Sequence, residues 1–201
     1  MNYDLVIFDL GGVVVQVESE RLLQELASLL ARPVEQIREV VYHKDLLLPF
    51  ELGRIGSRDY YQGLKTKLGL SWTYERFVQG WNWIFEENRD VTWIMQRLRK
   101  RHKLIALSNT NELHLHYIRT TISSLSVLDD WVASCEVGFC KPDPQIYELA
   151  LRRGGTRARA AIYIDDRPEL VQAGASLGLK AIRFEESRQL EQELQALGLN
   201  F

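Results

Sequence analysis

The chain has 201 residues, of which 46% are apolar and 26% are charged, and its formal net charge is −2. This composition is typical of a globular protein with one sizeable core and a smaller appended unit. The charge provides no basic surface for nucleic acid or an anionic membrane, and no apolar run approaches the roughly 20 residues that span a bilayer. We therefore expect neither nucleic acid nor a membrane as a partner.

The amino terminus begins with a strand-like segment instead of the basic stretch and apolar core of a signal peptide. The two cysteines, Cys135 and Cys140, match no metal-binding spacing and make a poor disulfide framework. We therefore expect a cytoplasmic protein with reduced thiols. The sequence indicates no oligomeric state.

The first strand-length run, residues 5–8, leads directly into Asp9, and Gly11 and Gly12 follow. A short, continuous apolar run of this kind predicts a buried strand. An ionised carboxylate at such a place is costly without a partner, so Asp9 needs a compensating charge. The two glycines let the backbone turn sharply and approach a ligand without a Cβ in the way.

The next segment, from about residue 15 to residue 88, shows only helical patterns. The predicted helices cover residues 19–31, 34–47, 57–67 and 73–85. Leucines at helical spacing give the first of them an apolar stripe that needs a partner. This segment is predicted to be an all-helical insertion that follows the first strand.

Four more strand-length runs follow, at residues 104–107, 132–133, 161–164 and 181–184, and helical patterns separate most of them. Asp143 and Pro144 predict the start of one such helix, as an N-cap and a proline at the first helical position, and Gly154 and Gly155 predict its end. Alternating strands and helices are typical of parallel βα units. The expected fold is an α/β core, residues 1–14 and 89–201, with a helical cap, residues 15–88.

Three of the predicted strands end in small polar or acidic residues, at Asp9, at Ser108 and at Asp165-Asp166. Ligands of open parallel sheets bind beyond the carboxyl ends of the strands, so we expect these side chains to lie close together. Clustered carboxylates repel one another, and a hard cation such as Mg²⁺ offsets that repulsion. Lys141, in the loop before a helix, can neutralise phosphate charge and temper the acidic cluster.

The same residue types suit phosphoryl transfer. The hydroxyl of Ser108 and the backbone N–H groups after it, at a predicted helix start, can hold phosphate oxygens. With a phosphorus atom held beside it, Asp9 can attack and form an aspartyl-phosphate. The pattern therefore indicates a phosphate-handling site.

In order and layout these residues resemble the four motifs of the haloacid dehalogenase-like superfamily. The motifs are "FDLGGVV" with Asp9, "LSNTN" with Ser108, "CKPDP" with Lys141, and "IDD" with Asp165 and Asp166. The resemblance covers essentially the whole chain. Within the superfamily the chain is most similar to the branch that holds bacterial α-D-glucose-1-phosphate phosphatases and the N-terminal phosphatase domain of soluble epoxide hydrolases.

The resemblance implies a Rossmann-like parallel sheet under the inserted helical cap. It also implies a phosphoric monoester hydrolase that binds Mg²⁺ and hydrolyses a small phosphorylated metabolite through an aspartyl-phosphate. A sugar phosphate is the expected substrate, because the resembling branch contains sugar phosphatases.

The resemblance also assigns roles to individual residues. Asp9 would be the nucleophile, with Lys141 as the second catalytic residue. The metal would be bound by Asp9, by the backbone carbonyl of Gly11 and by Asp166, with Asp165 a further ligand or a residue behind the ligands. The phosphoryl group would be held by Ser108, the Asn109 amide and Lys141.

The chain departs from the superfamily at two positions. Most phosphatases of this kind have a second aspartate two residues after the nucleophile, as general acid and base, whereas this chain has Gly11. General acid catalysis contributes about 10²–10⁴-fold, although an anomeric sugar oxygen needs less protonic help than a simple alkoxide. The second departure is Leu170, at a position that often carries Asp or Asn facing the metal.

Two alternatives stay open at this point. Gly11 and Leu170 allow a catalytically impaired protein that binds or senses a phosphorylated metabolite. A haloacid dehalogenase would also use an aspartate nucleophile, but without a metal. Asp165 and Asp166 disfavour it, because unneutralised carboxylates repel an anionic substrate.

Some residues of the predicted cap are candidates for contact with the substrate. Glu51 and Arg54 lie in a glycine-containing connection that could reach the site. His114 and His116, two residues apart on a predicted core helix, do not share a helix face and are expected to be partly exposed. Three aromatic residues could line a pocket or pack within the cap, and packing is favoured for at least two of them: Trp81, Trp83 and Phe85.

Overall fold

The computed structural model describes residues 3–199, and its centre is a parallel sheet with strand order β5-β4-β1-β6-β7. The strands are β1 (Leu5–Phe8), β4 (Lys103–Ser108), β5 (Asp130–Ala133), β6 (Ala161–Asp165) and β7 (Lys180–Arg183). The three central strands are almost entirely buried, as their continuous apolar runs predict. The predicted α/β core is confirmed.

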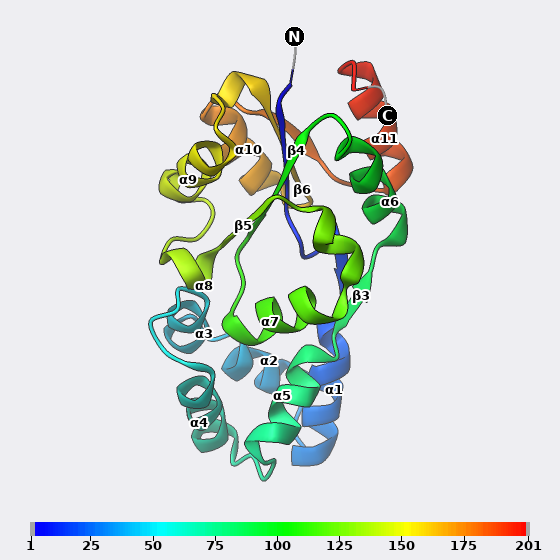
Figure 1. Cartoon of the computed structure of the whole chain (residues 1–201). Helices are drawn as coiled ribbons and strands as arrows, with labels where there is room; N and C mark the ends of the chain where they lie inside the picture. Colours follow the sequence, from blue (N-terminus) through cyan, green and yellow to red (C-terminus); the bar gives the residue numbers. More distant parts are fainter. Residues whose placement is uncertain (1–2, 200–201) are drawn as a thin grey trace.

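Helices cover both faces of this sheet (Figure 1). One face packs against α6 (Arg89–Leu98) and α11 (Ser187–Ala196), and the other against α9 (Pro144–Gly154) and α10 (Pro168–Ser176). Helix α9 begins and ends as predicted: the side chain of Asp143 accepts a hydrogen bond from the Gln145 N–H at 2.9 Å, and Gly155 follows the helix with φ 69°.

Further elements complete the core. They are α7 (Glu112–Thr121), α8 (Ser134–Val137) and 3₁₀ turns at Ser123–Val127 and Ala158–Ala160. Helix α7 starts just after β4 and lies between the sheet and the helical segment (Figure 1). Among the helices within residues 3–199, none is long and apolar enough to cross a membrane.

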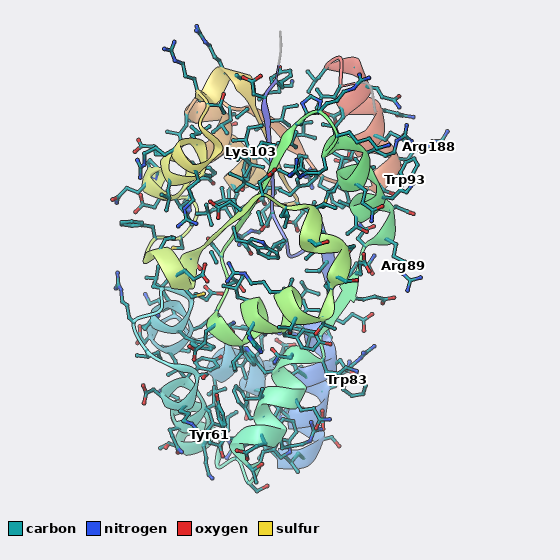
Figure 2. The ribbon with its side chains drawn as sticks, viewed as in Figure 1. Tyr61, Trp83, Arg89, Trp93, Lys103 and Arg188 are labelled. Atoms are coloured by element: carbon teal, nitrogen blue, oxygen red, sulfur yellow. The ribbon has the colours of Figure 1, made fainter. Side chains whose placement is uncertain are left out.

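The inserted segment forms helices with an apolar cluster of their own. The helices are α1 (Ser19–Leu30), α2 (Val34–Val41), α3 (Lys44–Glu51), α4 (Ser57–Leu68) and α5 (Tyr74–Asn82). The centre of the cluster is aromatic: the rings of Phe50 and Tyr60 stack at 4.6 Å, and Trp81 lies 5.1 Å from the ring of Tyr60. Trp83 is 59% exposed and points away from the cluster (Figure 2).

The prediction that residues 15–88 contain only helices is wrong. Strands β2 (Val15–Val17) and β3 (Phe85–Glu87) pair antiparallel where the chain leaves the core and where it returns. These two crossings lie side by side, so their backbone N–H and C=O groups find partners in each other. Strands of three residues are too short to show a hydrophobic period.

The helix predicted over residues 34–47 is two helices. It breaks after Val41, and α3 begins after His43, whose Nδ1 accepts a hydrogen bond from the Asp45 N–H at 3.4 Å. Helix α3 then runs through Pro49 and ends at Glu51, four residues beyond the predicted end. Because of this extension, Glu51 lies on a helix and not in a loop.

Candidate active site

The polar residues that follow the central strands meet at one edge of the sheet. Strand β1 lies between β4 and β6, and Phe8 pairs in register with Ala106 on one side and Ile164 on the other. Asp9 is therefore level with Leu107 and Asp165, and Ser108 lies one residue further along. The predicted convergence of the strand ends is present.

Asp9 is 5% exposed, and its backbone N–H donates to the Ile164 carbonyl at 2.8 Å. Its Oδ1 accepts from the Leu10 N–H at 2.7 Å and lies 2.9 Å from Lys141 Nζ. Burial raises the pKa of Asp9 to about 6, an effect that Lys141 opposes and the charge of Asp165 reinforces. At neutral pH Asp9 is therefore predominantly an ionised carboxylate, as a nucleophile requires.

Lys141 bridges two of the acids from a fully buried position. Its Nζ lies 2.9 Å from Asp9 Oδ1 and 2.6 Å from Asp165 Oδ2. Its backbone is held by the Asn109 side chain, which donates to the Lys141 carbonyl at 2.9 Å and accepts from the Lys141 N–H at 2.7 Å. The Asn109 side chain thus fixes the backbone of Lys141. The group of Asn109 that could bind a phosphate is therefore its own backbone N–H.

Asp165 is fully buried, and donors surround its carboxylate. Oδ2 accepts from Lys141 and from the Tyr163 hydroxyl, and Oδ1 accepts from the Arg167 N–H at 2.9 Å. Burial alone would raise the pKa of Asp165, but Lys141 and these hydrogen bonds hold it below its usual value. Tyr163 was not predicted as a site residue, because its place in the apolar run of β6 indicates only a buried strand position.

Asp166 is the most accessible of the three acids. Burial and the neighbouring Asp165 raise its pKa. One carboxylate oxygen from each of Asp9, Asp165 and Asp166 can be chosen so that all three lie within 4.8 Å of one another. Oxygen ligands at this spacing and with this charge suit a hard divalent cation.

The glycines after Asp9 differ in conformation. Gly12 has φ 80°, and a Cβ added there would overlap the Asp166 carboxylate. Gly11 is not in the left-handed region, and a Cβ there would meet only Val17 Cγ2, at 3.4 Å. The backbone therefore requires glycine at position 12, while position 11 has room for a Cβ.

Two connected hollows open at this edge of the sheet. The polar one has a volume of about 410 Å³ and is lined by Asp9, Gly11, Gly12, Val17, Glu51, Ser108, Asn109, Asp166 and Arg167. The other, of about 180 Å³, runs between the core and the helical segment and is mostly apolar; its wall includes Leu10, Leu22, Leu47, Trp81, Ile84 and Phe85. Gly11, Val17, Glu51, Ser108 and Asn109 line both of them.

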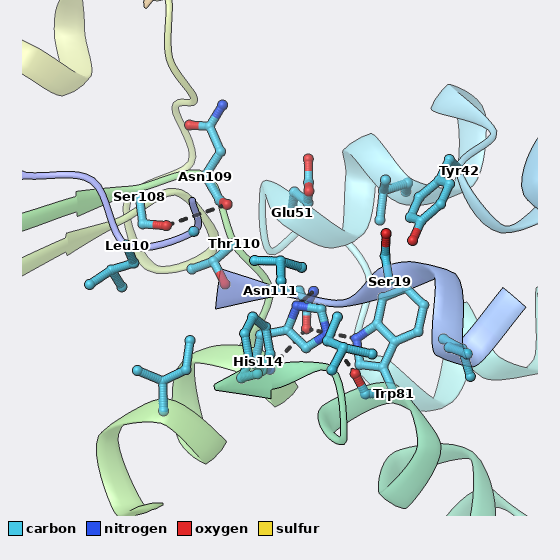
Figure 3. A pocket seen from close by; sticks show the side chains of 17 residues that line it. Leu10, Ser19, Tyr42, Glu51, Trp81, Ser108, Asn109, Thr110, Asn111 and His114 are labelled. Carbon is cyan, nitrogen blue, oxygen red and sulfur yellow. Dashed lines mark hydrogen bonds between the residues drawn. The ribbon is translucent and has the colours of Figure 1, made fainter. Parts of the chain in front are cut away.

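The polar groups of the apolar cavity mostly bond to one another (Figure 3). His114 stacks on Trp81 at 4.9 Å, with its Nε2 3.0 Å from the Trp81 carbonyl and its Nδ1 3.1 Å from Asn111 Nδ2. Asn111 Oδ1 accepts from Trp81 Nε1 at 3.3 Å and from the His114 N–H at 3.1 Å. Burial lowers the pKa of His114 to about 3, so this ring is neutral.

The structure therefore separates the residues expected near the substrate. Glu51, Trp81 and Phe85 line the cavity, whereas Arg54 and Trp83 do not. His114 is partly exposed, as expected, and its ring also lines the cavity, because α7 turns this side toward α5. Leu170 is 2% exposed and belongs to the core, where its carbonyl accepts from the Tyr147 hydroxyl at 3.3 Å.

Comparison with known proteins finds relatives along the whole chain. The chain is 23% identical over 200 residues to D-ribitol-5-phosphate phosphatase of Bacteroides thetaiotaomicron, which covers 96% of this chain and 97% of that protein. It is 24% identical over 202 residues to a sesquiterpene phosphatase of Aspergillus oryzae, which covers 98% of this chain and 97% of that protein.

The fold is also that of solved structures. A haloacid dehalogenase-family enzyme of Bacteroides thetaiotaomicron, in complex with magnesium and inorganic phosphate, superposes with a TM-score of 0.82 at 20% identity, over 92% of this chain and 95% of that one. The model of the haloacid dehalogenase-like hydrolase family matches residues 3–178, which include all four motifs. The chain belongs to the haloacid dehalogenase-like hydrolase family.

Proposed function

We propose that this protein is a Mg²⁺-dependent phosphatase that hydrolyses a small phosphorylated metabolite through a phosphorylated Asp9. The observation that carries the proposal is the cluster of Asp9, Asp165 and Asp166 with Lys141 buried between two of them. Both relatives described above are phosphatases, and the similar structure holds magnesium and phosphate. The cytoplasmic location expected from the sequence stays a prediction.

The donor set fits Mg²⁺. Three carboxylates face one lysine, so the cluster keeps an excess of negative charge that a divalent cation would neutralise. Asp9, Asp166 and the Gly11 carbonyl would hold the ion, with Asp165 as a further ligand or as the group that fixes Lys141. The bound ion would screen the phosphate from the carboxylates and polarise its oxygens.

The chain's own groups then account for the nucleophile. Among residues 3–199, two groups contact the Asp9 carboxylate as hydrogen-bond donors, the Leu10 N–H and Lys141 Nζ, and both contact Oδ1. Oδ2 therefore keeps its lone pairs for attack on phosphorus. Ser108 and the Asn109 N–H, at the mouth of the polar hollow, would hold the phosphoryl oxygens, and Lys141 would balance the charge that develops on them.

The substrate class rests on the leaving-group side of the site. A sugar phosphate is the class predicted from the sequence, and a polyol phosphate is the named substrate of one relative. The cavity beside the acids is lined mainly by apolar side chains, and its amide and imidazole groups bond to each other, which favours a less polar leaving group. A substrate screen should therefore include both sugar and aryl or alkyl phosphates.

The test is phosphate release from such a panel, with Mg²⁺ and with EDTA. Wild-type protein should release phosphate only with Mg²⁺, and Asp9→Asn should abolish release while keeping the fold. Binding of phosphorylated compounds without turnover in wild type would favour the binding or regulatory alternative. Activity on haloacids that survives EDTA would favour the dehalogenase.

A further inference from the structure

Glu51 lies where the polar hollow and the apolar cavity meet. It is the last residue of α3, and its side chain lines both of them, across from Ser108 and Asn109 (Figure 3). An ester bound with its phosphate beside Asp9 and its organic group in the apolar cavity would have its bridging oxygen near this junction. Glu51 is thus a cap residue at the place where the bond that breaks would lie.

The reaction needs a proton donor at this junction. The position two residues after the nucleophile is Gly11, which has no side chain to protonate the departing oxygen. Among the described residues that line the apolar cavity, Glu51 is the only carboxylic acid. The structure therefore offers one acid on the leaving-group side, and it comes from the cap.

The other titratable groups of the cavity are poorly suited. His114 is neutral, and both of its ring nitrogens are engaged, with the Trp81 carbonyl and the Asn111 amide. Burial raises the pKa of Tyr42, which lies at the far end of the cavity beside Ser19 (Figure 3). Neither supplies a proton readily at neutral pH.

The surroundings of Glu51 favour its protonated form more than water does. Burial raises its pKa, and Arg167, across the polar hollow, lowers it in part. Two further titratable groups lie within electrostatic range of this carboxyl: the Tyr60 hydroxyl on α4 and the Cys140 thiol before α9. The charge of Glu51 raises the pKa of both. Within residues 3–199 no group forms a hydrogen bond with the Glu51 side chain, so the carboxyl is available to a substrate.

We propose that Glu51 is the general acid and base of this phosphatase, in the role that Gly11 leaves empty; this rests on the proposed function above. When Asp9 attacks, the bond from phosphorus to the bridging oxygen breaks, and that oxygen takes the proton of Glu51 and leaves as the alcohol. The Glu51 carboxylate then takes a proton from water, whose oxygen bonds to phosphorus. The Asp9–phosphorus bond breaks, inorganic phosphate leaves, and Glu51 is protonated again.

The test compares two substrates with rings of similar size but different leaving groups. Benzyl phosphate releases an alkoxide that needs a proton, whereas p-nitrophenyl phosphate releases a stable phenolate. In single-turnover measurements, Glu51→Gln should slow the reaction of benzyl phosphate by about 10²-fold or more and that of p-nitrophenyl phosphate only slightly. Glu51→Asp, which keeps an acid, should lose less, and Glu39→Gln, an exposed cap substitution, should change neither rate.

A second variant separates the chemical role from a structural one. Gly11→Asp, at the position with room for a Cβ, should restore part of the benzyl phosphate rate when combined with Glu51→Gln. Equal losses on both substrates, or no loss on benzyl phosphate, would overturn the role of Glu51. Wild-type protein that turns over neither substrate, nor any phosphate ester of the panel, would instead overturn the proposed function.

Discussion

Lys141 Nζ lies 2.6 Å from Asp165 Oδ2, and neither side chain is exposed to solvent. The same Nζ lies 2.9 Å from Asp9 Oδ1, so one buried cation serves two buried carboxylates. Removing one partner of a buried ion pair leaves the remaining charge uncompensated, at a cost of about 3–5 kcal/mol. Lys141 therefore supports the folded state as well as the proposed reaction.

Lys141→Ala should lower kcat/KM at least about tenfold, which is about 1.4 kcal/mol of transition-state stabilisation. In metal-free buffer it should also lower the melting temperature, because Asp9 and Asp165 then repel each other without compensation. Mg²⁺ should recover part of the stability but not the activity. Lys67→Ala, on the exposed side of α4, is the control, and equal effects of the two substitutions would contradict this role.

Mg²⁺ should stabilise the folded protein, because it binds the acidic cluster only when the fold brings the acids together. A ligand at about 100 times its Kd adds about 2.7 kcal/mol to the free energy of unfolding. Thermal unfolding with MgCl₂, compared with NaCl at the same ionic strength, should show this shift in wild type. Asp166→Asn should remove most of it and the exposed Asp59→Asn none; a shift that survives in Asp166→Asn would contradict the assignment of Asp166 as a metal ligand.

The two glycines after Asp9 should respond differently to alanine. Gly12→Ala combines a φ of 80° with a Cβ that overlaps the Asp166 carboxylate, so it should lower both stability and Mg²⁺ binding. Gly11→Ala should be tolerated, because its Cβ meets only Val17. Urea unfolding and Mg²⁺ titration of both variants provide the comparison. Similar behaviour of the two would show that the loop rearranges around either side chain.

His114 should make stability depend on pH. Its pKa is about 3 in the folded protein and about 6.5 when unfolded, so between these values the unfolded chain binds a proton that the folded protein does not. Its contribution is complete above about pH 6.5 and is lost as the pH falls, by at most about 2 kcal/mol at pH 5. Urea unfolding at about pH 7 and pH 5 should show a smaller loss in His114→Gln than in wild type. His116→Gln, exposed on the same helix, should lose as much as wild type.

The sequence by itself determined the order of the core elements. The apolar runs that form β1, β4 and β6 are local features of the sequence. The start of helix α9, with Asp143 as its N-cap and Pro144 as its first residue, likewise involves only neighbouring residues. Such local features predict the same strand or helix whatever contacts the rest of the chain makes. The clustering of the acids at the strand ends could also be predicted from the sequence, because parallel strands have their carboxyl ends at the same edge of the sheet.

The tertiary structure decided the contacts between distant segments. The pairing of β2 with β3 depends on where the chain leaves and re-enters the core, and short strands carry no periodic signal. The hydrogen bonds between Asn109 and Lys141 join residues from different strands and loops, and no spacing in the sequence shows them. His114 on α7 and Glu51 at the end of α3 line the same cavity only because the helical segment packs against α7. The leaving-group side of the site forms where side chains of the helical segment pack against side chains of the core. This packing depends on the shapes of residues that come into contact only in the folded chain.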